Sequence, residues 1–433
     1  MMIKTFVSVT LGCKVNAYEV DSLTNELIKN GYTHALNDEA VGIALINTCS
    51  VTSSADQKSR QQIRRLAKKY PQAILIVMGC YAQINIELAE TIPEISIVIG
   101  TSNRRHILKY IEEYQKTKTQ IVAVDRASRT FTYEELNAPS LTKHARAYLK
   151  IQDGCDQFCT FCIIPLTRGK LRSRDPKDVI KEAKTLVAKG YKEIVLTGIH
   201  TGAYGLDLKD ISFSDLVKMI LDACPTLYKL RISSIEENEI DDALLLMMQQ
   251  DERLARHLHI PLQAGSDDVL RRMNRRYDTA AFLAKMHKIR AAVGDIALTT
   301  DVIVGFPGES EEDFQITYDF IKKVNFSELH VFPYSVRSKT PAASFKDQVS
   351  PPTKKARVQT LITLSNELKK AYSEKYVGET LSALIETYDM EKDLYIGHTS
   401  NYLDVYVRSE RDLTHELVTI EFGIELSKLI DSV

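Results

Sequence analysis

The sequence of 433 residues predicts an α/β protein in three parts. Strand-like apolar runs alternate with helical patterns over most of the chain, which is typical of parallel sheets built from βα units. Residues 1–135 contain three such runs and predict an N-terminal open parallel α/β sheet. Residues 140–370 contain six such runs, each followed by a helical pattern, and predict a central part of six βα units. Residues 376–433 contain short alternating runs, which predict a small C-terminal β-barrel.

The composition is 44% hydrophobic and 26% charged, as in ordinary soluble proteins, and the net charge is −1. This balance excludes a uniformly basic nucleic-acid binder but not local basic patches. Seven cysteines, an odd number, indicate a reducing compartment and metal or redox use. No apolar run approaches the length of a membrane span. The stretch before Cys13 is too short and polar for a lipoprotein leader, so we expect a cytoplasmic protein without membrane attachment.

The three strand-like runs of the first part each end at a cysteine. The runs cover residues 3–9, 41–46 and 73–78, with helical patterns over 17–30 and 55–69. They are followed by Cys13, Cys49 and Cys80. Because ligands bind at the carboxyl edge of an open α/β sheet, we expect these thiols to converge there. Gly12 and Gly79 would let the backbone turn tightly beside a bulky ligand.

Three buried structural cysteines are the alternative, since cysteine is common in cores. The same topological position for all three favours a metal cluster with three protein ligands and one open iron instead.

A second group of thiols opens the central part. Cys155, Cys159 and Cys162 follow the spacing Cys-x3-Cys-x2-Cys. Three thiolates so close can hold three corners of an iron–sulfur cube and leave one iron open for chemistry. A short zinc loop is the alternative, but zinc sites prefer two ligand pairs and no second pair follows.

The cysteine loop follows the first of six predicted strands, so we expect it at the carboxyl ends of these strands, where parallel α/β folds place their chemistry. The predicted strands cover residues 148–152, 193–197, 229–233, 257–261, 298–304 and 329–334. Helical patterns such as 176–188 and 282–292 lie between them, and another covers 354–371.

The Cys155 loop, with Phe161 just before its last cysteine, is the signature of the radical S-adenosylmethionine (SAM) enzymes, and the six βα units match their partial TIM-type barrel. The motifs Gly12–Asn16, Asn47–Thr52 and Gly79–Gln83 resemble the N-terminal domain of one branch, the methylthiotransferases. The resemblance implies two [4Fe-4S] clusters, an auxiliary one on Cys13, Cys49 and Cys80, and two SAM molecules per turnover.

Several strand ends of the central part resemble SAM-contacting motifs of the radical SAM enzymes. Gly198 would contact the SAM amino group, Ser233 and Glu236 the ribose, and the strand through Ile303 the adenine. The candidate SAM contacts are Phe161, Gly198, Ser233, Glu236, Gln263, Ile303 and Gly305. Taken singly, glycine after a strand is mostly turn chemistry, which remains the alternative.

Lys-Val-Asn after Cys13 and Val-Thr after Ser50 resemble the methylthiotransferases that act on N6-threonylcarbamoyladenosine at position 37 of tRNA. The resemblance implies that one SAM supplies a methyl group to sulfur and the other a radical that takes hydrogen from carbon 2 of the adenine. Methylthiolation of isopentenyladenosine in tRNA, or of a ribosomal-protein aspartate, and a non-catalytic iron–sulfur protein remain alternatives. The implied partners are tRNA and an external electron donor resembling flavodoxin or ferredoxin; we expect a monomer.

Basic residues gather in three places, and two of these contain the candidate RNA contacts. Lys58, Arg60 and Arg64 lie in the predicted helix after Cys49, and Arg168 and Arg172 follow the Cys155 loop. A solvated surface helix is the alternative for the first group. Arg271, Arg272, Arg275 and Arg276 form a third basic run, for which helix-surface charge is the alternative. Cys224 has no cysteine neighbour and is interpreted as structural.

The C-terminal part resembles the TRAM domain, an RNA-binding module of the methylthiotransferases, in position and size. Residues 376–433 carry twelve acidic and four basic residues, a poor composition for binding phosphate. This barrel therefore either contacts RNA through groups such as Tyr395 and Tyr402 or serves as a lid or spacer.

Overall fold

The computed structural model describes residues 3–36, 39–125, 132–136 and 145–432. The chain forms two compact units. The first contains Met1–Thr142, Lys150–Arg174 and Ser335–Ala343; the second contains Lys143–Leu149, Asp175–Tyr334 and Ser344–Val433. The units do not coincide with the three predicted domains, because the segment with the Cys155 loop groups with the N-terminal part of the chain.

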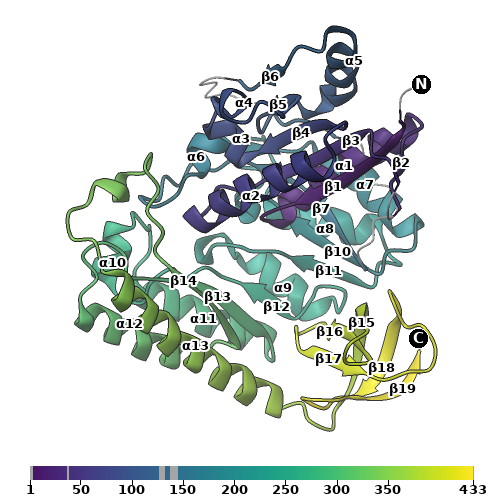
Figure 1. Ribbon diagram of the computed structural model, residues 1–433. Coiled ribbons are helices and arrows are strands. Elements are labelled where there is room, and N and C mark those ends of the chain that lie inside the picture. Colours follow the sequence, from purple (N-terminus) through teal and green to yellow (C-terminus); the bar gives the residue numbers. More distant parts are fainter. Residues whose placement is uncertain (1–2, 37–38, 126–131, 137–144, 433) are drawn as a thin grey trace. The chain divides into compact units, whose positions relative to one another are not determined.

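A parallel sheet forms the centre of the first unit, in the order β2-β1-β3-β4-β5-β6 (Figure 1). The strands are β1 (Thr5–Thr10), β2 (Thr33–His34), β3 (Ile43–Thr48), β4 (Ile74–Gly79), β5 (Ile97–Ile99) and β6 (Ile121–Ala123). The open parallel sheet is therefore confirmed. The strand order reverses direction between β1 and β3, and ligands bind at such a switch point in open α/β sheets.

Alternating side chains of β3 and β4 pack on opposite faces of this sheet, as the strand period of two requires. Ile43 and Leu45 lie in one core, beneath α1 (Lys14–Lys29) and α5 (Ile107–Thr117). Ala44 and Ile46 lie in the other, beneath α2 (Ser53–Lys69), α3 (Cys80–Ile84) and α4 (Leu88–Thr91). Apolar side chains on both faces explain why the strands read as continuous hydrophobic runs.

The first unit also contains three short elements. It contains the two-stranded pair β8 (Gln152–Asp153) and β9 (Arg172–Ser173), and the single-turn helix α6 (Ile164–Thr167). The Cys155 loop connects β8 to α6.

The second unit contains the barrel strands, which form two three-stranded sheets, β11-β10-β7 and β12-β13-β14. The strands are β7 (Arg146–Lys150), β10 (Glu193–Thr197), β11 (Lys229–Ile232), β12 (His257–His259), β13 (Ala297–Val304) and β14 (Glu328–Pro333). A parallel bridge from Leu230 to Leu254, just before β12, links the two sheets. Six strands in this order confirm the partial barrel.

Helices connect the barrel strands along the chain (Figure 1). They are α7 (Pro176–Ala188), α8 (Phe213–Ala223), α9 (Asp242–Gln250), α10 (Asp267–Arg272), α11 (Thr279–Val293) and α12 (Glu311–Val324). Local signals set their starts: Pro176 opens α7 behind the capping Asp175, and Ser310 with Asp313 forms a capping box at α12. The prediction for α7 has the observed bounds.

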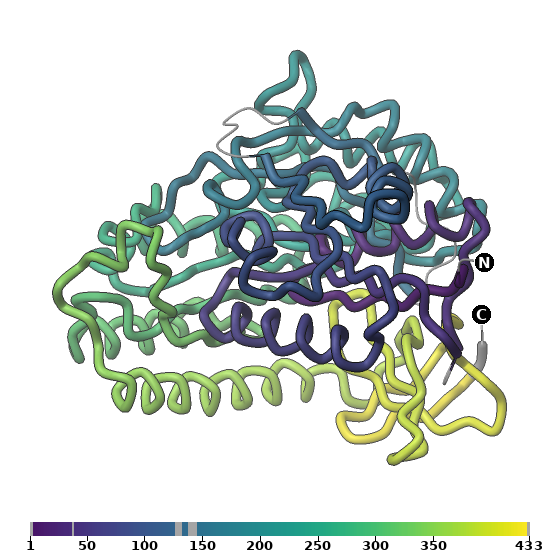
Figure 2. The backbone as a smooth tube through the Cα atoms, turned by 45° about the horizontal axis from the view of Figure 1, so that its top comes forward, coloured from purple at the N-terminus to yellow at the C-terminus, as the bar shows by residue number. Residues whose placement is uncertain are grey.

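The long helix α13 (Pro351–Glu374) leads from the barrel strands to the C-terminal sheet (Figure 2). This antiparallel half-barrel has the order β17-β16-β15-β18-β19. Its strands are β15 (Thr380–Asp389), β16 (Leu394–Thr399), β17 (Asp404–Val407), β18 (Leu417–Glu421) and β19 (Lys428–Ser432). Over the described residues, no helix has the length and apolar character needed to cross a membrane.

Candidate iron–sulfur sites

The three N-terminal cysteines converge at the carboxyl edge of the parallel sheet, as predicted. Cys13 precedes α1 directly after the loop that ends β1, Cys49 follows β3, and Cys80 is the first residue of α3 after β4. The three strands are direct neighbours in the sheet. Cys49 and Cys80 are buried and Cys13 is exposed, so the group lies at the edge of the fold rather than inside its core.

Gly12 lets the chain after β1 approach Cys49 closely. A Cβ atom at Gly12 would lie 2.8 Å from Cβ and 2.9 Å from Sγ of Cys49, and the φ angle of +102° is one that side-chain-bearing residues rarely adopt. Gly79 has φ +99°, and a Cβ there would lie 2.1 Å from Oδ1 of Asn47. The predicted tight turns at both glycines are confirmed, whereas the bulky ligand beside them stays a prediction.

The thiols are close enough to affect one another electrostatically. Burial raises the pKa of Cys49 to about 11, and the neighbouring Cys80 and Cys13 contribute to the increase. Burial also raises the pKa of Cys80, while Arg168 beside it acts in the opposite direction. A bound metal cation stabilises thiolates. Three thiols that meet at the edge of the sheet therefore fit a metal-containing group whose protein ligands are sulfur atoms.

The Cys155 loop is held by backbone hydrogen bonds at both ends. The Cys155 N–H donates to the Gly169 carbonyl oxygen over 3.1 Å, and the Cys162 N–H donates to the Cys159 carbonyl over 3.0 Å. Gly154 has φ +74°, and a Cβ there would lie 1.9 Å from the Lys170 carbonyl oxygen. These contacts fix the start of the loop against Gly169 and Lys170 and form a tight turn between Cys159 and Cys162.

All six candidate cluster ligands therefore lie in one compact unit. All seven cysteines, which include Cys224 in its buried position, carry thiols and form no disulfide.

Arg168 and Arg172 are buried, and this corrects their predicted role as RNA contacts. The side chain of Arg168 donates to Glu19 Oε1 over 2.8 Å, to Asn16 Oδ1 over 2.7 Å and to Asp153 over 3.2 Å. Arg172 donates to the Arg168 carbonyl oxygen over 2.7 Å. A guanidinium enclosed by carboxylates of its own chain does not reach a phosphate, so neither residue contacts RNA.

Arg168 instead lies between the two groups of cysteines. Its partners Asn16 and Glu19 belong to α1, the helix that begins after Cys13, and its charge acts on the Cys80 thiol. Its other partner, Asp153, accepts the Gly154 N–H over 2.8 Å, directly before Cys155. Arg168 thus contacts residues that lie next to both groups of cysteines.

Arg168 belongs to a larger buried network of ion pairs. Its cations are Arg104, Lys150, Arg168 and Arg172, and its anions are Glu19, Glu134 and Asp153. Burial alone would raise the pKa of Glu19, but Arg104, Arg168 and Lys150 outweigh it and hold the pKa well below its usual value. Among the described residues this network contains four cations and three anions, and Arg168 is the cation that acts on the Cys80 thiol.

A segment far along the chain supports the Cys49 loop. Arg337 donates to Ser50 Oγ over 2.7 Å and pairs with Asp56 at 2.8 Å, and the Ser53 N–H donates to Ser335 Oγ over 2.9 Å. Neither Arg337 nor the buried network was predicted from the sequence. Nothing in the local sequence around Arg337 indicates a partner 287 positions away.

The predicted SAM contacts of the second unit lie at or after the carboxyl ends of barrel strands. Gly198 follows β10, Ser233 follows β11, and Ile303 lies near the end of β13. Ser233 Oγ lies 3.3 Å from Thr201 Oγ1, and Glu236 pairs with Arg275. Gln263 has φ +64°; its N–H donates to the Asp301 carbonyl over 2.9 Å, and its own carbonyl accepts the Ile303 N–H over 2.8 Å.

Gly305 lies in close contact with Glu309 and Lys354. Its N–H donates to Glu309 Oε1 over 2.8 Å, and a Cβ there would lie 2.3 Å from Cγ of Lys354. Phe161, in the first unit, is partly buried beside Cys162. Contact of these seven residues with SAM stays a prediction.

The basic face of α2 is exposed, as RNA contact requires. Lys58, Arg60 and Arg64 are exposed, and Arg60 lies over the Tyr81 ring, 5.9 Å from its centroid. Of the third basic run, Arg275 and Arg272 pair with Glu236 and Asp313, whereas Arg271 and Arg276 are exposed. RNA binding by α2 stays a prediction.

The tyrosines of the C-terminal half-barrel are used inside the protein. Tyr402 stacks on His257, with 4.4 Å between ring centroids and 13° between planes, and the Arg231 guanidinium lies 4.9 Å from the Tyr402 centroid. Tyr395 is buried in the half-barrel core. His257 begins β12, so the half-barrel covers the amino end of the barrel strands. This placement favours the spacer interpretation over RNA contact by these tyrosines, because a lid over the chemistry would lie at the carboxyl ends of the strands.

Two protein-family models match the chain. The model described as the radical SAM superfamily matches residues 149–321, and the one described as uncharacterized protein family UPF0004 matches residues 5–100. The first match begins just before the Cys155 loop, and the second contains Cys13, Cys49 and Cys80.

Curated relatives match over nearly the whole chain. A threonylcarbamoyladenosine tRNA methylthiotransferase MtaB from Bacillus subtilis is 45% identical over 95% of this chain and 92% of its own length. The protein of the same name from Thermotoga maritima is 37% identical over 94% and 91%. A tRNA-2-methylthio-N(6)-dimethylallyladenosine synthase from Clostridium botulinum is 33% identical over 97% and 94%.

Among solved structures, the radical SAM methyltransferase TsrM from Kitasatospora setae, with cobalamin and a [4Fe-4S] cluster, is similar with a TM-score of 0.59. It is 13% identical, and the match covers 79% of this chain and 74% of the other. At this identity the similarity concerns the fold alone.

Proposed function

This chain belongs to the radical SAM methylthiotransferases, and we propose that it transfers a methylthio group to carbon 2 of N6-threonylcarbamoyladenosine at position 37 of tRNA. Relatives named for threonylcarbamoyladenosine reach 45% identity, against 33% for those named for dimethylallyladenosine. The family uses SAM and [4Fe-4S] clusters.

One observation carries the proposal: two triads of thiols, each one short of a full set for a four-iron cluster, lie in the same compact unit. Cys155, Cys159 and Cys162 would hold the cluster that binds and cleaves SAM. Cys13, Cys49 and Cys80 would hold the auxiliary cluster that carries the sulfur to be transferred. Bound there, the first group would supply the radical that an unactivated C–H bond demands, and the second would supply a soft-metal holder for the sulfur.

The protein itself would bind and orient the reacting molecules and exclude water from them. Gly12 and Gly79 bring the backbone to the auxiliary triad, and Arg168 stabilises negative charge at Cys80. In the second unit, Gly198, Ser233, Glu236, Gln263, Ile303 and Gly305 would contact SAM at the strand ends. Phe161 of the cysteine loop is a further proposed SAM contact. Arg275 holds the Glu236 carboxylate in one orientation, which prepares it to accept ribose hydroxyls.

The remaining partners follow from this function. tRNA is the substrate, and Lys58, Arg60 and Arg64 on the exposed face of α2 would contact its backbone. An external electron donor of the flavodoxin or ferredoxin type would reduce the cluster on the Cys155 loop. We place the reaction in the cytoplasm and expect the protein to act as a monomer.

The test is the nucleoside profile of tRNA from cells with and without this protein. Loss of the protein should remove 2-methylthio-N6-threonylcarbamoyladenosine, with accumulation of the form without the methylthio group. Methylthio-isopentenyladenosine, the product of the related synthases, is the internal control and should be unchanged. A loss of methylthio-isopentenyladenosine instead, or no change in either nucleoside, would overturn the proposal.

A further inference from the structure

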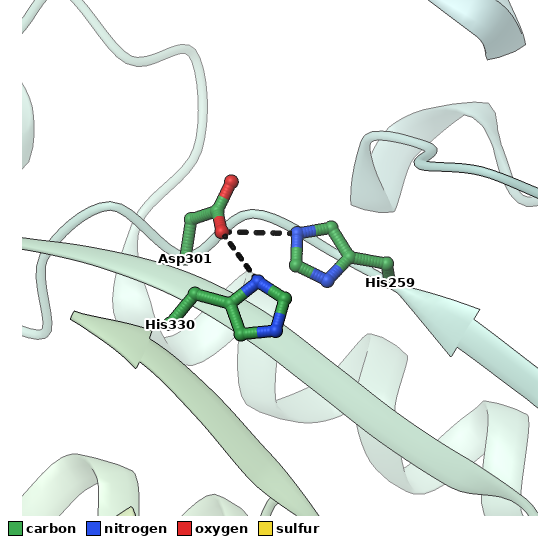
Figure 3. Close-up of side chains that lie close together, drawn as sticks. All are labelled: His259, Asp301 and His330. Atoms are coloured by element: carbon green, nitrogen blue, oxygen red, sulfur yellow. Dashed lines mark ion pairs between the residues drawn. The ribbon is translucent and has the colours of Figure 1, made fainter. Parts of the chain in front are cut away.

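Three side chains on adjacent barrel strands converge on one point inside the second unit (Figure 3). His259 lies on β12, Asp301 on β13 and His330 on β14. Asp301 and His330 are direct partners across the β13–β14 pair, and His259 is paired with Thr299, two residues before Asp301. Side chains at these register positions share one face of the sheet, so the convergence follows from strand pairing.

We propose that His259, Asp301 and His330 form a binding site for one divalent transition-metal ion, with two imidazole nitrogens and one carboxylate oxygen as ligands. Neither the six cysteines nor the proposed reaction requires this site. Two histidines and one carboxylate are a common ligand set for zinc and for other first-row divalent metals.

Two of the three separations between the ligand atoms are those expected in a coordination shell, and all three are below 4.8 Å. His259 Nε2 lies 3.2 Å and His330 Nδ1 lies 3.4 Å from the same oxygen, Asp301 Oδ1. A charge-assisted hydrogen bond between such groups is about 2.7–2.9 Å long. Ligand atoms about 2.0–2.1 Å from zinc in a tetrahedral site lie about 3.3–3.4 Å apart. The two measured separations fall close to that second range.

The surroundings of His259 resemble the outer shell of a metal ligand. Its second nitrogen, Nδ1, lies 2.9 Å from the Thr299 hydroxyl oxygen, which is also 2.9 Å from His257 Nε2. If the single hydroxyl proton points to His257, His259 donates from Nδ1 and turns the lone pair of Nε2 toward Asp301. A cation between that lone pair and the carboxylate then satisfies both, and a hydrogen bond that fixes the tautomer of a ligating histidine is usual at metal sites.

The site is accessible and lies in a defined layer of the barrel strands. The side chain of His259 is 11% exposed, and those of Asp301 and His330 are 31% and 50% exposed. Ile303, the predicted adenine contact, lies two residues further along β13 on the same face, about 6.6 Å along the strand. Three protein ligands leave at least one coordination position open to water or to another oxygen donor.

The test is equilibrium dialysis of the anaerobically reconstituted full chain against Zn²⁺, followed by metal analysis. Zinc taken up by other groups cancels in the difference between wild type and variants that keep all six cysteines. We expect His330→Ala and Asp301→Asn each to bind one zinc ion per chain fewer than wild type. Asp301→Asn keeps the shape of the side chain, and His287→Ala, which removes an exposed histidine of α11, is the matched control and should bind as wild type does.

Mn²⁺ provides a second readout, because its electron paramagnetic resonance spectrum is observed directly while oxidised [4Fe-4S] clusters are silent. The bound signal should be present in wild type and His287→Ala and absent in His330→Ala. Equal zinc in wild type and the two site variants, or an equal loss in the control, would overturn the proposal. Neither measurement depends on tRNA or on turnover, so a failure of the metal site and a failure of the proposed function are distinguishable.

Discussion

Removal of one buried carboxylate should strongly destabilise the first unit. Glu19 is fully buried and pairs with Arg104, Lys150 and Arg168, and its second oxygen also accepts the Asn47 side-chain amide over 3.2 Å. Glu19→Gln keeps the shape but removes one negative charge from the buried network and leaves its cations without that partner. An uncompensated buried charge costs about 3–5 kcal/mol. For a unit of this size, that lowers the unfolding temperature by about 6–20 °C.

The same variant has a defined pH dependence. Because the folded-state pKa of Glu19 lies well below its unfolded value, its stabilising contribution is complete above an unfolded pKa of about 4.3. The contribution is lost as pH falls from there toward the folded-state pKa. The difference in stability between wild type and Glu19→Gln should therefore be full at pH 7 and smaller at pH 3.

The assay is thermal unfolding of the reconstituted protein by circular dichroism at both pH values. Hydrogen exchange of peptides from α1 and β8 assigns the change to the first unit. Glu113→Gln, an exposed glutamate of α5 in the same unit, is the control and should change stability by less than about 0.5 kcal/mol. A loss below about 1 kcal/mol at pH 7, or an equal loss at pH 3 and pH 7, would refute the reasoning.

Further predictions concern the clusters, the RNA surface and the C-terminal half-barrel. Cys49→Ala should halve the iron content and abolish methylthiolation, whereas Cys224→Ala, which removes a buried thiol elsewhere, should leave the iron content unchanged; full iron in Cys49→Ala contradicts the auxiliary site. Replacement of Lys58, Arg64 and Lys68 by alanine should lower the slope of log affinity for tRNA against log salt by about 2–3, measured by fluorescence anisotropy, with Lys116→Ala as control. An unchanged slope removes α2 from the RNA interface. Tyr402→Ala, which loses the His257 stack and the Arg231 contact, should destabilise the second unit by about 2–3 kcal/mol without changing tRNA affinity; weaker tRNA binding in a variant that stays folded would restore the RNA role of this residue.

The placement of the cysteines could be predicted because it follows from periodicity and topology. Apolar runs of strand length end just before Cys13, Cys49 and Cys80, and parallel strands bring their ends to one edge. The short strands β5 and β6 were not predicted, because three residues are too few to establish a period. They extend the sheet on the side away from β1 and do not alter the position of the thiols.

The burial of Arg168 could not be predicted from its neighbourhood. Arg168, Lys170, Arg172 and Arg174 look like a basic surface run, yet of these only Lys170 is exposed. The carboxylates that enclose Arg168 lie 149 and 15 positions away along the chain. A charge run shows that cations are present, whereas the partners that decide between solvent and core come from other segments. The same applies to His259, Asp301 and His330, which only the strand register brings together.

The path of the chain through the buried network limits how this protein can be divided. A fragment that ends at residue 142 keeps Glu19 and Arg104 but loses Lys150 and Arg168, two of the three cations that neutralise the carboxylate. The N-terminal sheet is therefore not an independent folding unit, although it has hydrophobic cores of its own. A graft of this sheet onto a distant relative would have to carry residues 150–174 with it, or a host segment with the same charges at the same places.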